Sequence, residues 1–372
     1  MAYRKDPTKS KKIRGGFSPS DRFQICLENH WKNPRRLITL LLSPLSWLYR
    51  SVVQLRSCFY HLPGCRPVPY SIPVVIIGNL HSGGVGKTPT VIALAQALKN
   101  RKLRVGIVSR GYGRNNAGLL LVDTCANAVN YGDEPLLIAR KTGCPTVVAR
   151  QRKKAVEYLL NNFPDLDIIL SDDGLQHYAL ARDIEVVVFP YADLGKSLRS
   201  LPAGPLREPI SRLKTVPFII LSNAPSAHLP KATIQKQLNV SAKHIFFSHI
   251  LKETFYQLSD PVRQISSDFF KDKRVLAACA IANPDRFFTL LKTINSSSLE
   301  TISFPDHQIL PLECLAKAFE CVIITEKDAV KYSGRPLKNV FVCSVATFLD
   351  EDFIAAFLQY FDGKCKEKIG NG

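Results

Sequence analysis

The sequence lacks several features that would place it in common protein classes. Its ten cysteines include no Cys-x-x-Cys pair and no Cys/His cluster with zinc spacing. A chain of 372 residues needs no disulfides for its core, so we expect reduced, mostly buried thiols in a cytosolic protein. The most apolar run, 37–49, has 13 residues, whereas crossing a bilayer takes roughly 20. No small-residue cleavage site follows this run, which argues against a signal peptide.

Acidic residues are scarce relative to basic ones. Asp and Glu number 31 against 50 Lys and Arg, which leaves a formal net charge of +19. Residues 1–60 contain 12 basic and 3 acidic side chains, so nearly half of the excess lies in the first sixth of the chain. Nucleic-acid-binding proteins usually spread basic residues over a folded face, and no recognition motif of that class is present. The distribution favours an anionic membrane surface over nucleic acid as the partner.

Composition and hydrophobic pattern divide the chain into four segments. Residues 1–30 are polar and basic and predict a flexible tail. Residues 31–70 contain a Leu-rich stretch flanked by arginines, with Pro44 as a kink, which fits either a helical hairpin in the membrane interface or a pair of core helices. Alternating strand and helix patterns predict an α/β domain at 71–222 and a second, smaller one at 223–372.

A glycine loop between a predicted strand and a predicted helix is the strongest local signal. The β-branched run 73–78 predicts a buried parallel strand, and apolar residues recur at helical spacing from Val91. Backbone N–H groups of such a loop bind phosphate oxygens, while Lys87 contacts the β- and γ-phosphates and Thr88 holds Mg²⁺. His81 stands where the standard pattern has its first glycine. The predicted nucleotide-binding residues are Ser82, Gly83, Gly84, Val85, Gly86, Lys87 and Thr88.

Carboxylates occur at two further places that a phosphotransferase could use. Asp172 and Asp173 end an apolar strand, as metal-binding acids do beside a P-loop, although a capping turn is the alternative. Asp133 and Glu134 directly precede a predicted helix. From the residues alone, capping of that helix is the favoured interpretation for this second pair.

Two arginines flank a Gly-Tyr-Gly loop at the end of the predicted strand 104–109. Ligands of open α/β sheets bind at the carboxyl ends of strands. Arg110 and Arg114 could therefore contact an anionic substrate, although solvated loop arginines explain the pattern equally well.

Seven motifs in this order and spacing resemble the tetraacyldisaccharide 4′-kinases (lipid A 4′-kinases) of Gram-negative bacteria. The resemblance runs from about residue 40 to 360. The motifs are GNLHSGGVGKTP (78–89), VSRGYGR (108–114), GDEPLLIARKT (132–142), ILSDDGLQHY (169–178), LPAGPLREP (201–209), FPDH (304–307) and TEKDAVK (325–331).

This resemblance implies a fold and an activity. The family has a P-loop-containing α/β/α sandwich and a second α/β domain, with the active site between them and N-terminal helices in the membrane interface. It transfers the γ-phosphoryl group of ATP, with Mg²⁺, to the 4′-hydroxyl of a tetraacyl disaccharide 1-phosphate. The expected location is the cytoplasmic face of the inner membrane, and the expected partners are that surface and the acylated substrate.

The resemblance also assigns roles to individual residues. Asp133 matches the catalytic aspartate, which overturns the capping interpretation, and His307 matches the histidine of a second-domain motif that reads Asp306-His307-Gln308 here. We expect Asp133 to accept the hydroxyl proton and His307 to raise its basicity or orient it, with Lys87 as the third catalytic residue. The implied metal ligands are Thr88, Asp172, Asp173 and Glu208. The candidate substrate contacts are Arg110, Arg114, Gln176 and His177.

A switch ATPase of the partitioning type is the alternative, because it carries a similar glycine loop and a membrane helix. Its signature is a lysine directly before the first glycine, where this chain has Ser82. That class also leaves the RGYG, GDEP and DDGLQH motifs unexplained. We expect stimulation of ATP consumption by an acylated disaccharide, by DNA or by neither to separate the kinase, nucleic-acid and ATPase interpretations.

Overall fold

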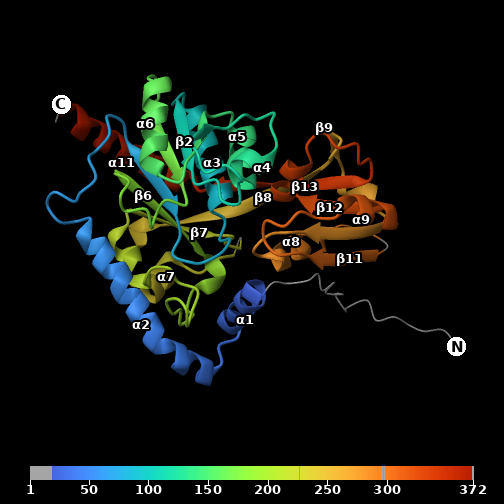
Figure 1. Cartoon of the computed structure of the whole chain (residues 1–372), viewed down its shortest axis with the longest axis horizontal. Helices are drawn as coiled ribbons and strands as arrows, with labels where there is room; N and C mark the ends of the chain where they lie inside the picture. The colour runs from blue at the N-terminus through green and yellow to red at the C-terminus, as the bar shows by residue number, and fades with distance from the viewer. Residues whose placement is uncertain (1–18, 226, 293, 295, 297, 371–372) are drawn as a thin grey trace.

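The computed structural model describes residues 19–225, 227–292, 294, 296 and 298–370, which build one continuous 13-stranded sheet with helices on both faces (Figure 1). The strand order is β11-β10-β12-β13-β8-β7-β6-β1-β5-β2-β4-β3, and β9 pairs with β8. We call residues 71–248 together with the helix at 351–370 the first unit, and residues 249–349 the second unit.

The first unit is a mainly parallel sheet whose central strands are buried on both faces, as their uninterrupted apolar sequences predict. Its strands are β1 (Val74–Gly78), β2 (Val105–Ser109), β3 (Leu120–Leu121), β4 (Thr146–Val148), β5 (Ile168–Asp172), β6 (Ile184–Pro190) and β7 (Phe218–Ser222). Its helices are α3 (Lys87–Asn100), α4 (Ala128–Tyr131), α5 (Asp133–Thr142), α6 (Arg152–Asn162), α7 (Lys231–Leu238) and α11 (Glu351–Gly370).

The second unit extends the same sheet. Its strands are β9 (Asp260–Ile265), β10 (Arg274–Cys279), β11 (Ser298–Ser303), β12 (Cys321–Thr325) and β13 (Val340–Leu349), and its helices are α8 (Pro284–Leu291), α9 (Leu312–Ala318) and α10 (Glu326–Ala329). β10, β11, β12 and β13 run parallel, and β13 pairs antiparallel with β8 (Ile245–Gln257).

Strand β8 belongs to both units and corrects the predicted domain boundary. Its first residues pair parallel with β7, and Ser248 faces Ser222 on that side and Leu349 of β13 on the other. The division between the units therefore lies inside β8 rather than at residue 222. The C-terminal helix α11 also returns to the first unit, where Phe353 and Phe357 pack against Phe218. The sequence analysis placed β8 and α11 in the second domain, because no local sequence pattern shows that a strand or helix passes from one unit to the other.

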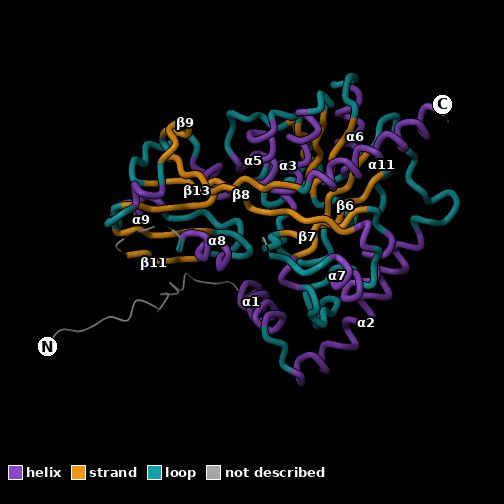
Figure 2. Tube along the Cα trace, turned by 180° about the vertical axis from the view of Figure 1, so that it is seen from behind, coloured by secondary structure: helices purple, strands orange, loops and turns teal. Residues whose placement is uncertain are grey.

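Two N-terminal helices, α1 (Pro19–Lys32) and α2 (Arg36–Phe59), form a hairpin along one side of the first unit (Figure 2). The predicted tail at 1–30 is wrong for residues 19–30, which lie in α1, and residues 1–18 lie outside the described part of the chain. Helix α2 continues through Pro44, the expected kink. Within the described ranges, the structure has no helix that is both long and apolar enough to cross a membrane.

The cysteines are all free thiols, but they are less buried than the sequence predicted. Four are buried, two are partly buried and four are exposed. The exposed thiols are Cys26, Cys58, Cys125 and Cys314. They lie in helices or loops at the surface of the molecule, where composition alone gives no indication of burial.

Candidate active site

The glycine loop leaves the carboxyl end of β1 and leads directly into α3, as a phosphate-binding loop requires. Gly86 precedes the helix with a φ of 97°, a conformation that glycine adopts without steric cost. The Ser222 hydroxyl at the end of β7 donates to the Val85 carbonyl (2.7 Å), and the Ser82 N–H donates to the Pro205 carbonyl (2.7 Å). A neighbouring strand and the loop at 201–209 thus fix the shape of the glycine loop.

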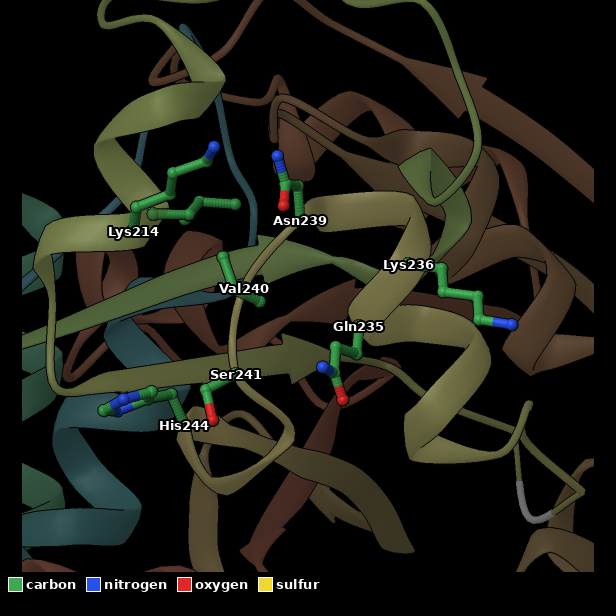
Figure 3. Close-up of a pocket in the computed structure, with 8 residues that line it drawn as sticks. Lys214, Gln235, Lys236, Asn239, Val240, Ser241 and His244 are labelled. Atoms are coloured by element: carbon green, nitrogen blue, oxygen red, sulfur yellow. The ribbon is translucent and has the colours of Figure 1, made fainter.

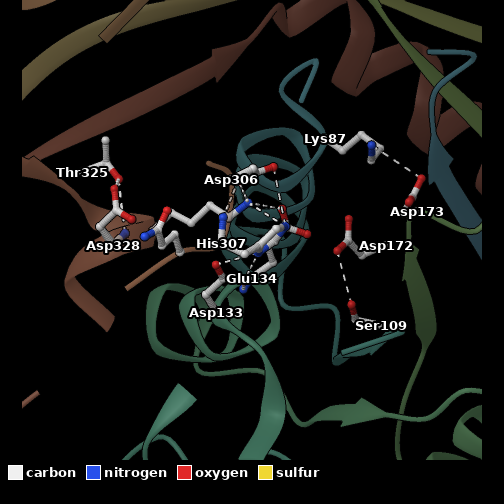
Figure 4. Close-up of polar contacts among 12 residues, drawn as sticks. Lys87, Ser109, Asp133, Glu134, Asp172, Asp173, Asp306, His307, Thr325 and Asp328 are labelled. Carbon is white, nitrogen blue, oxygen red and sulfur yellow. Dashed lines mark hydrogen bonds and ion pairs between the residues drawn. The ribbon is translucent and has the colours of Figure 1, made fainter. Parts of the chain in front are cut away.

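Lys87, the first residue of α3, lies in a network of polar side chains. Its ammonium donates to Asn79 Oδ1 (3.2 Å). It also lies 3.5 Å from Asp173 Oδ1, as Figure 4 shows. The Arg207 guanidinium donates to Asp173 Oδ1 (3.0 Å) and to the His81 carbonyl (2.8 Å). Burial alone would raise the pKa of Asp173, but Lys87 and Arg207 outweigh it and hold that pKa well below its usual range.

His81, where the standard pattern has glycine, is buried at the start of the loop. Its Nε2 lies 3.1 Å from Asp193 Oδ2, and its ring packs against Phe189 at 5.1 Å between centroids. Its carbonyl oxygen still accepts from Arg207. The departure from the P-loop pattern is therefore accommodated by packing outside the phosphate-facing part of the loop.

Asp172 is an almost completely buried carboxylate at the tip of β5. The Ser109 hydroxyl donates to its Oδ2 (3.3 Å), while Oδ1 has no hydrogen-bond partner. Burial raises the pKa of Asp172 to about 7, and the charges of Glu134 and Asp173 add to this effect. A cation at this position would relieve an environment that otherwise disfavours the ionised carboxylate.

These residues fit a magnesium ion shared with a nucleotide. In the described ranges, no group of three or more His, Cys, Asp or Glu side chains is arranged to hold a metal by itself. Mg²⁺, however, typically uses one or two carboxylates together with substrate phosphates and water. Asp172 and Asp173 supply oxygen ligands of that kind, as could the hydroxyl of Thr88, the second residue of α3. The unpartnered Oδ1 of Asp172 is the observation that supports the fit.

Asp133 and His307 come from different units and meet directly (Figure 4). Asp133 is the first residue of α5 and only 5% exposed, and its Oδ2 lies 2.9 Å from His307 Nδ1. The ammonium of Lys331 lies 3.6 Å from the same oxygen. His307 adopts a φ of 66°, which costs energy for a residue with a side chain and is typical of functional sites. The sequence separation of 174 residues makes this contact a product of the tertiary structure.

The pKa values of this pair shift in opposite directions. Burial would raise the pKa of Asp133, but the hydrogen bond from His307 and the charges of Lys327, His307 and Lys331 lower it. Burial would lower the pKa of His307, but its hydrogen bond to Asp133 raises it. The lowered pKa of Asp133 argues against the expectation that His307 raises its basicity, because the hydrogen bond from His307 stabilises the carboxylate. Orientation of Asp133 by His307 remains.

Lysines from the second unit complete the contacts around α5. Lys327 Nζ donates to Glu134 Oε1 (2.9 Å) and to Asp306 Oδ1 (3.1 Å). Lys331 Nζ donates to Asp328 Oδ1 (3.2 Å), and Asp328 is fully buried. Both lysines belong to the TEKDAVK motif (325–331), and a spacing of four residues places them on one face of a helical turn.

The remaining acidic prediction, Glu208, is buried and already engaged. Its Oε1 accepts from Gln176 Nε2 (2.8 Å), its Oε2 accepts from the Tyr178 hydroxyl (2.8 Å), and Arg212 lies 3.4 Å from Oε2. These contacts favour a structural role over metal ligation. Gln176 also donates to the Asn79 carbonyl (3.0 Å), so its amide joins β1 to the 201–209 loop.

His177 lies within a cluster of arginines. Burial and four arginines lower the pKa of its imidazole to about 4. In order of effect these are Arg152, Arg182, Arg56 and Arg110. Arg114 is instead held by the carbonyls of Ala117 (3.2 Å) and Val148 (3.5 Å), which indicates a structural role in its loop.

Sequence reasoning missed Asn79, Arg152 and Arg207 in this site. Arg152 donates to the carbonyls of Asp172 (3.4 Å) and Asp173 (3.0 Å) and so supports the tip of β5. Asn79 and Arg207 lie inside the GNLHSGG and LREP motifs, so their position in these motifs was the available signal. Arg152 is the first residue of α6 and lies outside every motif, so no signal in the sequence pointed to it.

A cavity of about 570 Å³ lies elsewhere, between the 3₁₀ helix η2 (Ile210–Thr215) and α7 (Figure 3). Its lining mixes polar and apolar side chains and includes none of the predicted site residues. The residues are Leu213, Lys214, Gln235, Lys236, Asn239, Val240, Ser241 and His244. It therefore does not mark the position of the phosphate-binding loop.

Comparison with known proteins identifies the family. The family model described as tetraacyldisaccharide-1-P 4′-kinase matches residues 38–362. The tetraacyldisaccharide 4′-kinase of Neisseria gonorrhoeae is 39% identical over 347 residues, which cover 92% of this chain and 97% of that protein. The chain belongs to this family.

Other relatives give the same result. The tetraacyldisaccharide 4′-kinase of Dechloromonas aromatica is 37% identical over 342 residues, covering 91% of this chain and 98% of that protein. The crystal structure of the "apo" form of LpxK from Aquifex aeolicus in complex with ATP has a TM-score of 0.71 to this chain at 28% identity, covering 87% of this chain and 98% of that chain. The predicted P-loop α/β fold and kinase activity are thus confirmed, and a partitioning-type ATPase is not favoured.

Proposed function

We propose that this kinase transfers the γ-phosphoryl group of ATP to the 4′-hydroxyl of a tetraacyl disaccharide 1-phosphate at a membrane surface, with Asp133 as the general base. The observation that carries the assignment is the 2.9 Å contact between Asp133 and His307 beside the glycine loop. Glu134, the neighbour of Asp133, is close enough to raise the pKa of Asp172, which links this pair to the metal-binding acids.

Asp133 is the base because His307 is unsuited to that role. The Nδ1 of His307 faces Asp133, and its Nε2 lies 3.4 Å from the Lys327 ammonium and 3.6 Å from Asp306 Oδ2. Burial and the charge of Lys327 lower the pKa of His307, but its hydrogen bond to Asp133 outweighs them and favours the doubly protonated form, which has no lone pair to accept a proton. The ionised Asp133 carboxylate is held in place and accepts the proton of the sugar hydroxyl.

The glycine loop and the acidic pair bind and orient the donor. The loop N–H groups and Lys87 hold the phosphates, and Asp172, Asp173 and Thr88 would hold Mg²⁺. The metal supplies neutralisation of charge on the transferring phosphoryl group. Arg207 bonds to both Asp173 and the glycine loop and so holds the two in fixed positions relative to each other.

The arginine cluster around His177 is the proposed contact for the phosphate that the acceptor already carries. Arg110 is exposed, and Arg56 lies on α2, so the cluster joins the strand ends to the N-terminal hairpin. Arginine side chains bind phosphate oxygens with two parallel hydrogen bonds. His177 stays neutral in this surrounding and leaves the positive charge to the guanidinium groups.

Helix α2 is the proposed membrane contact. One face is anchored to residues 200–209. The Ser46 hydroxyl donates to the Ser200 carbonyl (3.1 Å), and the Tyr49 hydroxyl donates to the Arg207 carbonyl (3.1 Å). The other face carries large exposed apolar side chains, among them Leu37 (77%) and Trp47 (80%). Flanking arginines would contact anionic headgroups. Arg207, which contacts α2, also contacts His81 of the glycine loop. An acylated substrate held at α2 would therefore lie close to the bound phosphates.

Membrane binding is tested by replacing exposed leucines of α2. Leu41→Glu with Leu48→Glu should reduce binding to anionic vesicles at least tenfold, since burial of each leucine contributes roughly 1.5–3 kcal/mol. The melting temperature should not fall, because both side chains are exposed. Gln54→Glu adds a charge on the same helix without removing an apolar side chain and is the control. Unchanged vesicle binding of the double variant would place the membrane contact elsewhere.

The activity is tested by phosphoryl transfer to a tetraacyl disaccharide 1-phosphate, with and without Mg²⁺. The expected result is product phosphorylated at the 4′ position only when ATP, Mg²⁺ and the acylated acceptor are all present. Parallel reactions with DNA or with no acceptor should show no stimulated ATP consumption. Stimulation by DNA, or equal ATP consumption without acceptor, would contradict the proposed function.

A further inference from the structure

The loop between β10 and α8 brings the second unit against the glycine loop. A Cβ atom added to Gly84 would lie 3.1 Å from the Cβ of Ala282, so the two loops are in contact. Helix α8 begins two residues later, at Pro284. The residues at the start of α8 therefore lie near the phosphate-binding part of the first unit.

The same loop is fixed by His307 and Asp328 of the second unit. The His307 N–H donates to the Ala280 carbonyl (3.2 Å), and the Ala280 N–H donates to Asp328 Oδ2 (3.1 Å). Asp328 is fully buried, so this anchoring is rigid. The position of the α8 start relative to the glycine loop is thus determined together with the position of His307.

Arg286, in the first turn of α8, has no anionic partner. Within the described residues it forms no ion pair and no hydrogen bond. Its neighbours Phe287 and Leu291 are buried in the apolar cluster of the second unit, and Arg286 itself is partly buried. Burial lowers the pKa of the Arg286 guanidinium, but an arginine remains charged in proteins, so the cost of its burial stays uncompensated.

From helix geometry we expect the Arg286 side chain to lie over the first turn of α8. Side chains on an α-helix lean toward its N-terminus and cover the preceding turn. For Arg286 this is the turn that continues from Ala282, the residue in contact with Gly84. Asp285, the adjacent acid, instead lies 3.8 Å from Lys32 of α1, which runs beside α8 in both views (Figures 1 and 2).

We propose that Arg286 binds the terminal phosphate of ATP from the side of the second unit, opposite Lys87. A guanidinium offers planar, paired hydrogen bonds to phosphate oxygens, and the γ-phosphate supplies the anionic partner that Arg286 lacks in the chain itself. Its charge stabilises the phosphoryl group during transfer, as an arginine does in other P-loop enzymes. The inference rests on the proposed nucleotide site and adds a second-unit residue to it.

The test compares nucleotide binding and turnover in the full-length chain carrying Arg286→Gln. Fluorescent ATP and ADP analogues give the two dissociation constants, and the transfer assay gives kcat and the KM of the acceptor. We expect ATP affinity to fall roughly 10–100-fold, the range for loss of hydrogen bonds to a charged group. We expect ADP affinity to change less than twofold, kcat to fall and the acceptor KM to stay the same. Arg286→Lys should recover part of the loss.

A matched control and a second readout keep the result interpretable. Arg274→Gln makes the same change at the opposite end of β10, at a side chain 60% exposed and paired with Glu300, and should leave both affinities unchanged. The melting temperature of Arg286→Gln should not fall, because no partner is left uncompensated. If that variant fails to fold, the ATP and ADP affinities of Arg286→Lys decide, since it keeps the charge and loses the paired geometry.

Three outcomes would overturn the inference. One is wild-type ATP affinity and kcat in the folded Arg286→Gln variant. Another is equal weakening of ATP and ADP, which would mean that Arg286 only shapes the glycine loop. The third is a change confined to the acceptor KM, which would assign Arg286 to the phosphate of the acceptor. In each case Lys87→Ala should still lose transfer if the proposed function holds, so the two failures are distinguishable.

Discussion

The two α/β units share one sheet but contribute different groups to the candidate active site. The first unit supplies the glycine loop with its Lys87 and the carboxylates of Asp133, Asp172 and Asp173. The second unit has no glycine loop in its sequence and supplies His307 and Lys327, which contact the start of α5. This difference shows that a repeated layer architecture does not repeat a function: each unit completes the charge balance of the other.

The two halves of the site also differ in how they are assembled. Lys87 and Asp173 lie at the carboxyl ends of neighbouring parallel strands, so the first unit alone brings them within 3.5 Å. Asp133 and His307 meet only because β8 fixes the units side by side in one sheet. Substitutions in the first group should therefore act on the donor, and substitutions in the second group on proton transfer and on the contact between units.

The largest effect is expected for Lys87→Ala, which removes the phosphate-binding charge of the first unit. Transfer should fall on the order of 10³–10⁵-fold, comparable to loss of other cations that stabilise phosphoryl transfer. The fold should persist, because the side chain is at the surface of the site rather than in the core. Activity and circular dichroism are the measurements, and Lys154→Ala, an exposed lysine of α6, is the control. A near-native rate in the folded variant would remove the P-loop from the mechanism.

Asp133→Asn should have the next largest effect, because it keeps the size of the proposed base and removes its basicity. We expect kcat to fall roughly 10²–10⁴-fold, with ATP affinity almost unchanged. Adding His307→Ala should lower kcat little further, since the two residues act as a unit. Asp165→Asn, an exposed carboxylate of the same unit, is the control. Loss of ATP or Mg²⁺ binding with normal kcat would instead make Asp133 a metal ligand.

His307→Gln should make stability less dependent on pH. The pKa of His307 is raised in the folded protein, so its ion pair with Asp133 stabilises fully below the unfolded pKa of about 6.5 and is lost as pH rises through the folded pKa. The variant should therefore be less stable than wild type by about 1–3 kcal/mol at pH 6, and by less at pH 9.

Denaturant unfolding at several pH values measures this difference. His61→Gln, a change at an exposed histidine just after α2, serves as the control. A destabilisation that is equal at pH 6 and pH 9 would mean that His307 acts through packing, not through charge.

The smallest effect is expected at the other end of α5. Lys141 forms an ion pair with Glu326 of the second unit and donates to the Ser344 hydroxyl (3.1 Å). Because Lys141 is about one third exposed, Lys141→Met should cost about 1 kcal/mol or less in the contact between units, which lowers kcat up to about fivefold through the position of Asp133. Lys153→Met breaks an exposed ion pair with Glu157 on α6 and should have no effect on kcat. A loss as large as that of Asp133→Asn would show that this contact controls the base directly.

The sequence by itself determined the parts of this protein that depend on neighbouring residues. The β-branched run and the glycines before Lys87 specify a strand, a tight loop and a helix start, and Asp172 follows from the end of an apolar strand. Motif order carried the assignment of His307 and that of Asp133, although the local pattern at Asp133 favoured a helix cap. The length of β8 and the return of α11 had no local signal, because each depends on partners distant in the chain.

The tertiary structure decided how these residues act on one another. Whether His307 raises or lowers the pKa of Asp133 depends on burial and on the lysines that surround the pair, and the lowered pKa argues against the sequence prediction. The engagement of Glu208 by Gln176 and Tyr178, and the partial burial of Arg286 without a partner, are likewise invisible in the sequence. Electrostatic energies depend on distance and solvent exposure, and both are fixed only when the two units share one sheet.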